Sequence, residues 1–504
     1  MIFLILLSFV ISTTIGILLT FIFFPIRKLK SVGLWLRFLI GAPLGMGLTS
    51  CLYFLCLLAN HSGYIFAIEI MAVLFLFALV FFVFIRRGTG QGGVLNPPVI
   101  LKFKFQWIFP MVFYSALLSS VISFIIATLK EPHGKWDAWW IWNFHARFIF
   151  RSAEHWRNMF TSALEWTHLD YPLLLPLSIV RSWRYMGGES LSASILPAFL
   201  FTFITVGLIW AALSILRSRN QGYLGGLVLM GSPFFIVLGA SQLADIPLAF
   251  FFLLTFVLIF IYDRLLEYDR KGLLILTGLA AGLSAWTKNE GLLFLALVMA
   301  TRFAIMVYAG GWRQAVKEVL WISAGAGPVV IIVAIFKLQL ALSDHLFAGM
   351  TMQQILSKLS NVHRYWEILK PYVLTGLSFT QGFANIRTGI HFNPGLVNII
   401  LLSVYLMLMG VRVDRKDRLN LLNAGAVLLL MLAGHFVIYL ISPYELNYHL
   451  MTSLNRLYMQ LWPSAVFLLF MAARTPEEAL ISKDVMSSGE KNFKNKQRKR
   501  GKRS

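Results

Sequence analysis

The chain contains a long series of apolar runs, most of which are long enough to cross a bilayer as helices. A hydrocarbon core about 30 Å thick requires roughly 20 apolar residues per spanning helix. By that measure we expect an all-α, polytopic helical membrane protein with about thirteen transmembrane helices. The apolar runs lie near residues 1–24, 38–58, 64–85, 106–129, 190–216, 222–240, 246–262, 272–286, 291–308, 319–340, 394–411, 419–441 and 457–473.

The composition excludes a soluble protein. Hydrophobic residues make up 58% of the chain and charged residues 13%, whereas a soluble domain carries roughly a quarter charged residues. The excess of 44 Lys and Arg over 22 Asp and Glu would suggest nucleic-acid binding in a soluble protein. In a membrane protein, cytoplasmic loops that retain cations explain the same excess. We therefore expect contact with membrane lipids and no nucleic-acid partner.

Lys and Arg gather in every second short connection between the apolar runs, while the connections near Asn60 and Gln242 hold none. Because cytoplasmic connections retain these residues, the alternation predicts an amino terminus outside and a carboxyl terminus inside. The basic segment 474–504 is then a disordered cytoplasmic tail at the lipid surface. The cationic connections hold Arg27, Lys28, Lys30, Arg37, Arg86, Arg87, Lys102, Lys104, Arg217, Arg219, Arg264, Arg270, Lys271, Arg313, Lys317, Arg412, Arg415, Lys416 and Arg418.

A long outer loop over residues 130–189 interrupts the apolar pattern. Its segment KWDAWWIWNFHARFIF mixes Trp and Phe with basic residues, which is typical of a helix lying in the membrane interface. The apolar run 171–180 is too short to span comfortably, so we expect a second interfacial helix there. If this run did span, Asp245 would move to the inner side.

Acidic residues stand at the outer ends of several apolar runs. Asp137, beside the bilayer and among Trp residues, could accept a proton from a substrate, or it could cap the helix that follows. His168 and Asp170 form a second polar cluster, or they make loop hydrogen bonds. Asp245 could be a helix cap, or it could face one cavity with Asp137 and share a divalent ion or acid and base duties.

Three cations stand on the same outer side. Lys288 interrupts an apolar hairpin, and His449 and Arg456 lie seven residues apart, near one face of a helix entering the membrane. Such cations suit a lipid phosphate. Alternatively, Lys288 pairs with Glu290 or a neighbouring acid, and Arg456 reaches the headgroups.

The order of KWDAWW, HLDYP, ADIPLAFFF, GLAAGLSAWTKNEGLL and YHLMTSLNRLYMQLWP resembles the GT-C superfamily of membrane glycosyltransferases. The likeness is to the bacterial branch that includes protein O-mannosyltransferases and the lipid A aminoarabinose transferase. It covers roughly residues 106–473 and leaves residues 1–105 as an extra amino-terminal bundle. The core then includes outer loops 130–189 and 341–393, and the second of these could act as a lid over the donor.

The resemblance implies an inverting enzyme of the bacterial inner membrane. Such enzymes move a sugar from a polyprenyl-phosphate carrier to an acceptor on the outer, periplasmic face. Asp137 would be the base, Asp245 would lie near the donor or a metal, and Lys288 and Arg456, with His449 as a weaker match, would surround the phosphate. The acceptor is a glycolipid, a saccharide or a protein, and the lack of an appended soluble domain favours the first two. Mg²⁺ or Mn²⁺ bound by Asp137 and Asp245 is possible but not required.

Two alternatives use the same headgroup chemistry. A transporter or flippase for a lipid-linked sugar would favour internal symmetry and charges near the bilayer midplane. A polysaccharide polymerase or ligase with a diphosphate-linked donor would need more outer cations. Those of the 341–393 loop keep this possibility open: Lys358, Arg364, Lys370 and Arg387.

Overall fold

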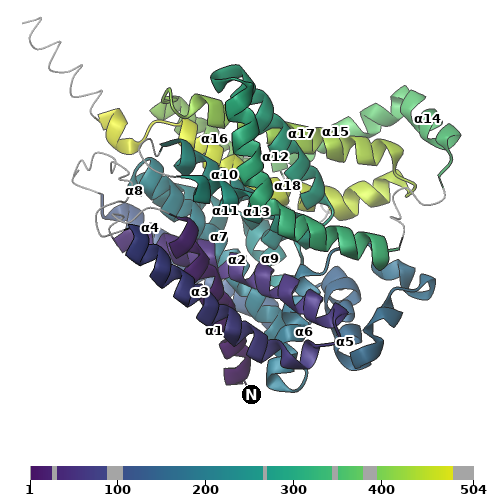
Figure 1. The fold of residues 1–504 in the computed structure, drawn as a ribbon. Helices are drawn as coiled ribbons and strands as arrows, with labels where there is room; N and C mark the ends of the chain where they lie inside the picture. The colour runs from purple at the N-terminus through teal and green to yellow at the C-terminus, as the bar shows by residue number, and fades with distance from the viewer. Residues whose placement is uncertain are drawn as a thin grey trace, which may run out of the picture.

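The computed structural model describes residues 2–24, 31–87, 106–264, 270–342, 350–378 and 394–480, and over these ranges the protein is almost entirely helical (Figure 1). Within them, extended pairing is confined to one isolated bridge between Val411 and Ala473. The all-α polytopic membrane fold is thereby confirmed.

The helices follow the apolar runs closely, usually within a few residues at each end. The first ten are α1 (Ile2–Phe23), α2 (Ser31–Leu58), α3 (Ile65–Arg87), α4 (Ile108–Lys130), α5 (Asn143–Ser152), α6 (Leu174–Met186), α7 (Ser192–Leu216), α8 (Arg219–Met230), α9 (Pro233–Ala240) and α10 (Asp245–Arg264). The others are α11 (Lys271–Thr287), α12 (Glu290–Gly310), α13 (Trp312–Gln339), α14 (Met352–Ser360), α15 (Val362–Ser378), α16 (Pro394–Met409), α17 (Arg418–Ile441) and α18 (Leu446–Ala472). Short helical turns are η1 (Ser62–Tyr64), η2 (Ala138–Trp142), η3 (Ala153–Met159) and η4 (Ser162–Thr167).

The number of spans is smaller than expected. Among the described residues, nine helices are long and apolar enough to cross a membrane, or ten if α8 and α9 form one bent span. The expected thirteen is therefore not confirmed. The run 222–240 is divided by a bend of 67°. The bend has a local cause, because Pro233 has no backbone N–H with which to continue α8.

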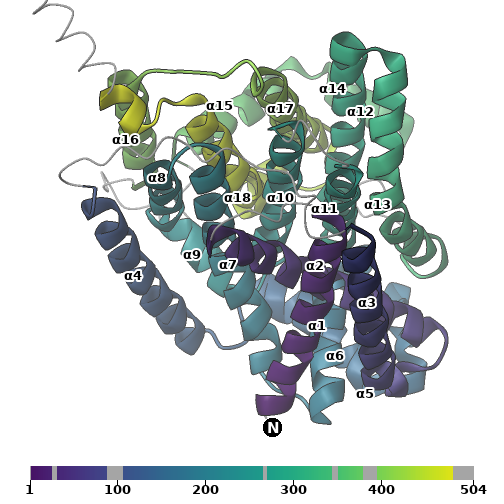
Figure 2. The same ribbon diagram turned by 60° about the vertical axis from the view of Figure 1, so that its left-hand side comes forward.

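Helix α10 forms the centre of the molecule and is enclosed along its apolar length. It packs against α7, α11 and α18 (Figures 1 and 2). A helix that is apolar on all sides can face lipid or be buried by other helices, and α10 is buried by other helices. Its 20 residues extend about 30 Å, so its two ends mark opposite ends of the bundle.

The first three helices join the same core. Helices α1 and α2 cross closely, since a Cβ at Gly45 would lie 1.8 Å from the carbonyl oxygen of Ser12. Both helices also contact α6, α7 and α11, while Figure 2 shows α4 on the flank of the bundle, where it packs against α8 and α9. The proposed boundary at residue 105 stays a prediction.

The second helix expected in the outer loop, over residues 171–180, is α6. It begins at Leu174 and buries ten of its 13 residues against the bundle, and it is not among the helices long enough to span a membrane. It packs against α1, α2, α5 and α7. Arg181 of α6 is buried as well, and its charge is paired with buried Glu69 of α3.

Cations of the predicted cytoplasmic connections meet at one end of the bundle. Arg217 donates to the carbonyl oxygen of Ala473 at 2.8 Å, and its guanidinium lies 3.3 Å from the Glu478 carboxylate. Arg264 binds Asp417. Connections far apart in sequence are thus joined at the carboxyl-terminal end of α10. Several residues used for the topology lie outside the described residues: Arg27, Lys28, Lys30, Lys102, Lys104 and 481–504.

Candidate functional site

At the opposite end of α10, charged residues from four separate segments form one cluster. Arg456 of α18 contacts Asp137 of the outer loop, and its Nε and Nη2 atoms lie 3.0 and 2.9 Å from Asp245 Oδ2. Lys288 Nζ lies 3.2 Å from Asp245 Oδ1 and 2.8 Å from Glu290 Oε1. Asp245 therefore bridges the two cations.

Gln460 of α18 completes this cluster. Its amide nitrogen donates to Asp245 Oδ1 at 2.6 Å and to Glu290 Oε1 at 3.4 Å. Arg456 and Gln460 are four residues apart and therefore share one face of α18. We call Asp137, Asp245, Lys288, Glu290, Arg456 and Gln460 the ionic cluster.

Exposure is graded across the ionic cluster. The side chain of Asp245 is 0% exposed, that of Arg456 is 15% exposed and that of Asp137 is 31% exposed. Lys288 is also buried. A reactant arriving from solvent or the bilayer surface would therefore meet Asp137 first and reach Asp245 last.

Local backbone geometry explains how Lys288 comes to lie in the ionic cluster. Lys288 has φ −161° and ψ 159°, an extended conformation that ends α11, and α12 starts two residues later. The break turns the lysine side chain out of the helical hairpin. Its Nζ then lies 5.9 Å from the centre of the Tyr171 ring, which stacks with Trp142 and His168.

Asp170 belongs to a second polar group beside the ionic cluster. Its Oδ2 accepts a hydrogen bond of 2.6 Å from Asn289, and its backbone oxygen accepts one of 2.6 Å from Lys337. Lys337 also donates to Asn289 Oδ1 at 2.8 Å. Because Asn289 lies between Lys288 and Glu290 in the chain, the two groups are neighbours.

His449 is placed differently from the other candidates. Its Nδ1 lies 2.8 Å from the Ser442 hydroxyl, and its ring packs against Tyr439 at 4.7 Å. The structure thus brings Asp137, Asp245, Lys288 and Arg456 together, places Asp170 beside them, stacks His168 on Tyr171 and puts His449 in a separate contact.

The alternative interpretations of these residues can now be separated. Asp137 makes no side-chain capping bond to the turn that follows it, so the cap interpretation is wrong. Lys288 does pair with Glu290, as the alternative held, and it also pairs with Asp245. Arg456 binds two carboxylates within the protein rather than reaching out toward headgroups.

The ionic cluster is a poor ligand set for Mg²⁺ or Mn²⁺. Asp137 and Asp245 are joined through Arg456, and a cation there repels a metal ion. Among the described residues, no group of three or more His, Cys, Asp or Glu could hold a metal ion. These hard cations prefer several oxygen ligands at once.

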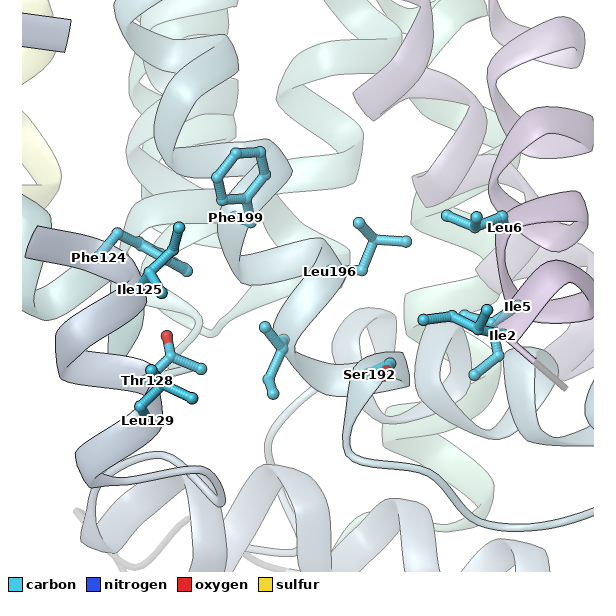
Figure 3. A pocket seen from close by; sticks show the side chains of 11 residues that line it. Ile2, Ile5, Leu6, Phe124, Ile125, Thr128, Leu129, Ser192, Leu196 and Phe199 are labelled. Atoms are coloured by element: carbon cyan, nitrogen blue, oxygen red, sulfur yellow. The ribbon is translucent and has the colours of Figure 1, made fainter. Parts of the chain in front are cut away.

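An apolar groove of about 280 Å³ lies apart from the ionic cluster, between α1, α4 and α7 (Figure 3). Its walls include Ile5, Phe124, Leu196 and Phe199, and no charged side chain lines it. Such walls suit hydrocarbon and cannot perform acid–base chemistry, so the ionic cluster is the candidate site of reaction.

Several members of the site were missed from the sequence. Glu290 was considered only as a partner of Lys288, and Gln460 and Lys337 were not considered. Lys337 lies near the end of a long apolar run, where a cation ordinarily reaches toward the headgroups. A polar residue within a membrane helix is itself a signal of function, and this signal could have identified Gln460.

A polytopic helical protein with a buried ionic cluster at one end of its helices has the arrangement of a membrane enzyme working at the bilayer surface. Residues 172–336 match the family described as dolichyl-phosphate-mannose-protein mannosyltransferase, which is a GT-C superfamily family. The resemblance to that superfamily is thereby confirmed. Comparison with curated proteins and with solved structures gives no significant match.

The family match indicates a membrane glycosyltransferase that uses a polyprenyl-phosphate-linked sugar. The matched residues include Asp245, Lys288 and Glu290, whereas Asp137, Lys337 and Arg456 fall outside them. The structure connects the two regions, because Arg456 binds Asp245 directly.

Proposed function

We propose that the protein transfers a sugar, with inversion, from a polyprenyl-phosphate carrier to an acceptor on the outer face of the bacterial inner membrane. The observation that carries this proposal is the double contact of Arg456 with Asp137 and Asp245. This contact supports the proposal because Arg456, the proposed phosphate-binding cation, lies directly beside the partly exposed carboxylate of Asp137.

The proposed reaction balances without a further reactant. An acceptor hydroxyl forms a bond to the anomeric carbon while the bond from that carbon to the phosphate oxygen breaks. Asp137 takes the hydroxyl proton, and the phosphate leaves with the bonding electron pair and gains one negative charge. Lys288 and Arg456 stabilise this charge more in the transition state than in the ground state.

The donor phosphate must compete with the acids of the ionic cluster. The ionic cluster contains the carboxylates of Asp137, Asp245 and Glu290. With the two cations Lys288 and Arg456, its formal charge is −1. Additional negative charge is unfavourable there unless a carboxylate moves away. Asp137 is the most exposed of these acids, and we infer that the phosphate replaces it on Arg456 and frees it to act as the base.

The family match favours a transferase over a transporter, since its description names a sugar-transferring enzyme. It also names a monophosphate carrier, which weighs against a diphosphate-linked donor. Two cations of the second outer loop already have partners in the protein: Lys358 donates to the carbonyl oxygen of Ser442 at 2.7 Å, and Arg364 donates to that of Leu440 at 2.7 Å. Arg387 lies outside the described residues.

The acceptor class can be tested in cells. We expect mass spectrometry of cell-surface glycolipids to show a glycosylated species that disappears when the gene is deleted and returns with the wild-type protein. Complementation by Asp137→Asn should not restore it. An unchanged glycolipid profile after deletion would reject a lipid acceptor and direct the search to saccharides and proteins.

A further inference from the structure

His435 is a buried histidine that the proposed reaction does not use. It lies on α17 with 1% of its surface exposed. Within the part of the chain that the structure describes, neither of its ring nitrogens has a hydrogen-bond partner. Unpaired polar groups in a protein interior are costly and rare, and a ligand is one of the reasons that proteins retain them.

The position of His435 points to the ionic cluster. Its neighbour Gly434 packs against the Leu293 side chain of α12, one turn from Glu290. Glu290 and Lys288 are the charged groups that act on the His435 ring. The ring therefore lies at the level of the α11–α12 break.

Gln460 supplies a second unpaired group. Its amide nitrogen is bonded to Asp245, but its Oε1 is buried and has no hydrogen-bond partner among the described residues. Helices α17 and α18 pack together, so two unsatisfied side chains approach the ionic cluster from adjacent helices.

The chemistry of the two side chains selects the kind of ligand. A neutral imidazole offers one donor and one acceptor, and the Gln460 oxygen is an acceptor. Hydroxyl groups can satisfy all three positions, since each both donates and accepts. A phosphate ester without a proton only accepts, so the Gln460 oxygen would repel it.

We propose that His435, together with Gln460 Oε1, binds hydroxyl groups of the sugar on the donor, which makes His435 a specificity-determining residue. This inference rests on the proposed function, because it requires a donor that joins a sugar to a phosphate held by Lys288 and Arg456. It assigns the phosphate and the sugar to different side chains, which can be tested separately.

The test measures binding of two probes to the purified full-length protein: a polyprenyl phosphate, and the same lipid bearing mannose, glucose or another hexose. We expect the wild type to bind at least one hexose-bearing lipid more tightly than the bare carrier. His435→Phe, which keeps the ring volume, should weaken that hexose-bearing lipid roughly tenfold and leave the bare carrier unchanged. His435→Gln, which keeps a donor and an acceptor, should recover part of the loss.

Asn423 provides a matched control on the same helix. It is also fully buried, and neither polar atom of its side chain has a hydrogen-bond partner among the described residues. It lies twelve residues from His435, or about 18 Å along α17 toward the other end of the bundle. Asn423→Leu should therefore leave the difference between the two probes at its wild-type value.

Each other outcome has a definite meaning. An equal loss of both probes in His435→Phe would show a structural role and overturn the inference. The inference would also be overturned if the wild type bound every hexose-bearing lipid no more tightly than the carrier. If the wild type bound none of the probes, the proposed function itself would fail, and that result is distinguishable from the other two.

Discussion

Arg456 binds the carboxylates of Asp137 and Asp245 at the same time. Substitutions of Asp137 and of Arg456 should therefore affect donor binding differently. If the donor phosphate displaces Asp137, removing the Asp137 charge should help the donor to bind even as it stops the chemistry. Removing Arg456 should weaken donor binding. The two substitutions therefore have opposite expected effects on one measured quantity.

We predict that Asp137→Asn abolishes transfer and tightens binding of the hexose-bearing polyprenyl phosphate about threefold to tenfold, since a charged competitor for Arg456 is lost. Arg456→Ala should weaken the same binding by at least tenfold. Titration calorimetry in detergent with purified variants would measure both. Weaker donor binding in Asp137→Asn would refute the exchange of partners on Arg456.

Because His145 of the outer loop is buried, we predict that the stability of the protein depends on pH. Burial, reinforced by nearby His168, lowers the pKa of His145 to about 3, below the ordinary value of about 6.5. The folded protein thus keeps the ring neutral, while the unfolded chain binds a proton below pH 6.5. The contribution of His145 to stability is complete above pH 6.5 and is lost progressively as the pH falls toward 3.

We expect the wild type to lose about 2 kcal/mol more stability than His145→Gln between pH 7.5 and pH 5. Thermal unfolding of the detergent-solubilised protein, followed by intrinsic Trp fluorescence, would measure the difference. Identical pH dependence in the two proteins would contradict the assignment of a neutral, buried His145.

At the scale of elements, α6 is held between the first helices and the outer loop. Arg181 Nη2 lies 2.6 Å from Glu69 Oε2 of α3, and it also donates to the Ser8 carbonyl oxygen at 2.7 Å. Because α6 begins three residues after Tyr171, this ion pair fixes the helix behind the second polar group. It gives helices α1 and α3 a structural connection to the candidate site.

We predict that Glu69→Ala destabilises the protein by about 3–5 kcal/mol, because it leaves the Arg181 charge buried and unpaired. The double variant Glu69→Met with Arg181→Met removes both charges and should lie close to the wild type. Unfolding midpoints in detergent would compare the three proteins. Equal destabilisation in the single and double variants would show that packing, rather than charge, holds α6.

The extents of the elements were largely predictable, and the exceptions have physical causes. Helix α18 begins at Leu446, eleven residues before the expected run, because Glu445 caps its first turn and the turns that follow are amphipathic rather than apolar. A search for apolar runs of spanning length does not detect amphipathic turns that extend a helix beyond such a run. The α8–α9 bend could have been anticipated from Pro233, but its angle depends on packing.

The sequence predicted only those members of the candidate site that are charged residues at expected outer helix ends, where charged residues are rare. Asp137, Asp245, Lys288 and Arg456 stood out because few charged residues occur at the expected outer ends. The Asp170–Asn289 bond joins residues 119 positions apart, and only tertiary packing determines such a pair. His435 does not lie at an expected outer helix end and belongs to no motif, so the sequence did not identify it. Its burial and its lack of hydrogen-bond partners among the described residues are seen only in the structure.

At the scale of the whole molecule, two charge groups lie at opposite ends of α10. One is the ionic cluster with Asp245, and the other joins Arg264 to Asp417. From the distribution of loop cations we predict that the first lies on the outside and the second on the cytoplasmic side. Cys51 and Cys56 are buried and should not react with a polar thiol reagent, which makes labelling of introduced cysteines practical.

We predict that Lys135→Cys reacts with a membrane-impermeant maleimide in spheroplasts, whereas Lys416→Cys reacts only after permeabilisation. Both positions are exposed, so a lack of labelling cannot be attributed to burial in the protein. Gel-shift detection of each variant, with the wild type as the unreactive control, would report the side. The reverse pattern would invert the topology and move the ionic cluster to the cytoplasmic face.

We propose that the ionic cluster performs sugar transfer with Asp137 as the base. The most direct measurement uses purified protein in lipid vesicles, a polyprenyl phosphate bearing a labelled hexose, and extracted cell-envelope acceptors. We predict that the wild type converts the donor to free polyprenyl phosphate and a labelled product of inverted anomeric configuration, while Asp137→Asn binds the donor and releases no carrier. Wild-type turnover retained in Asp137→Asn, or movement of intact donor across the vesicle membrane without transfer, would contradict the account.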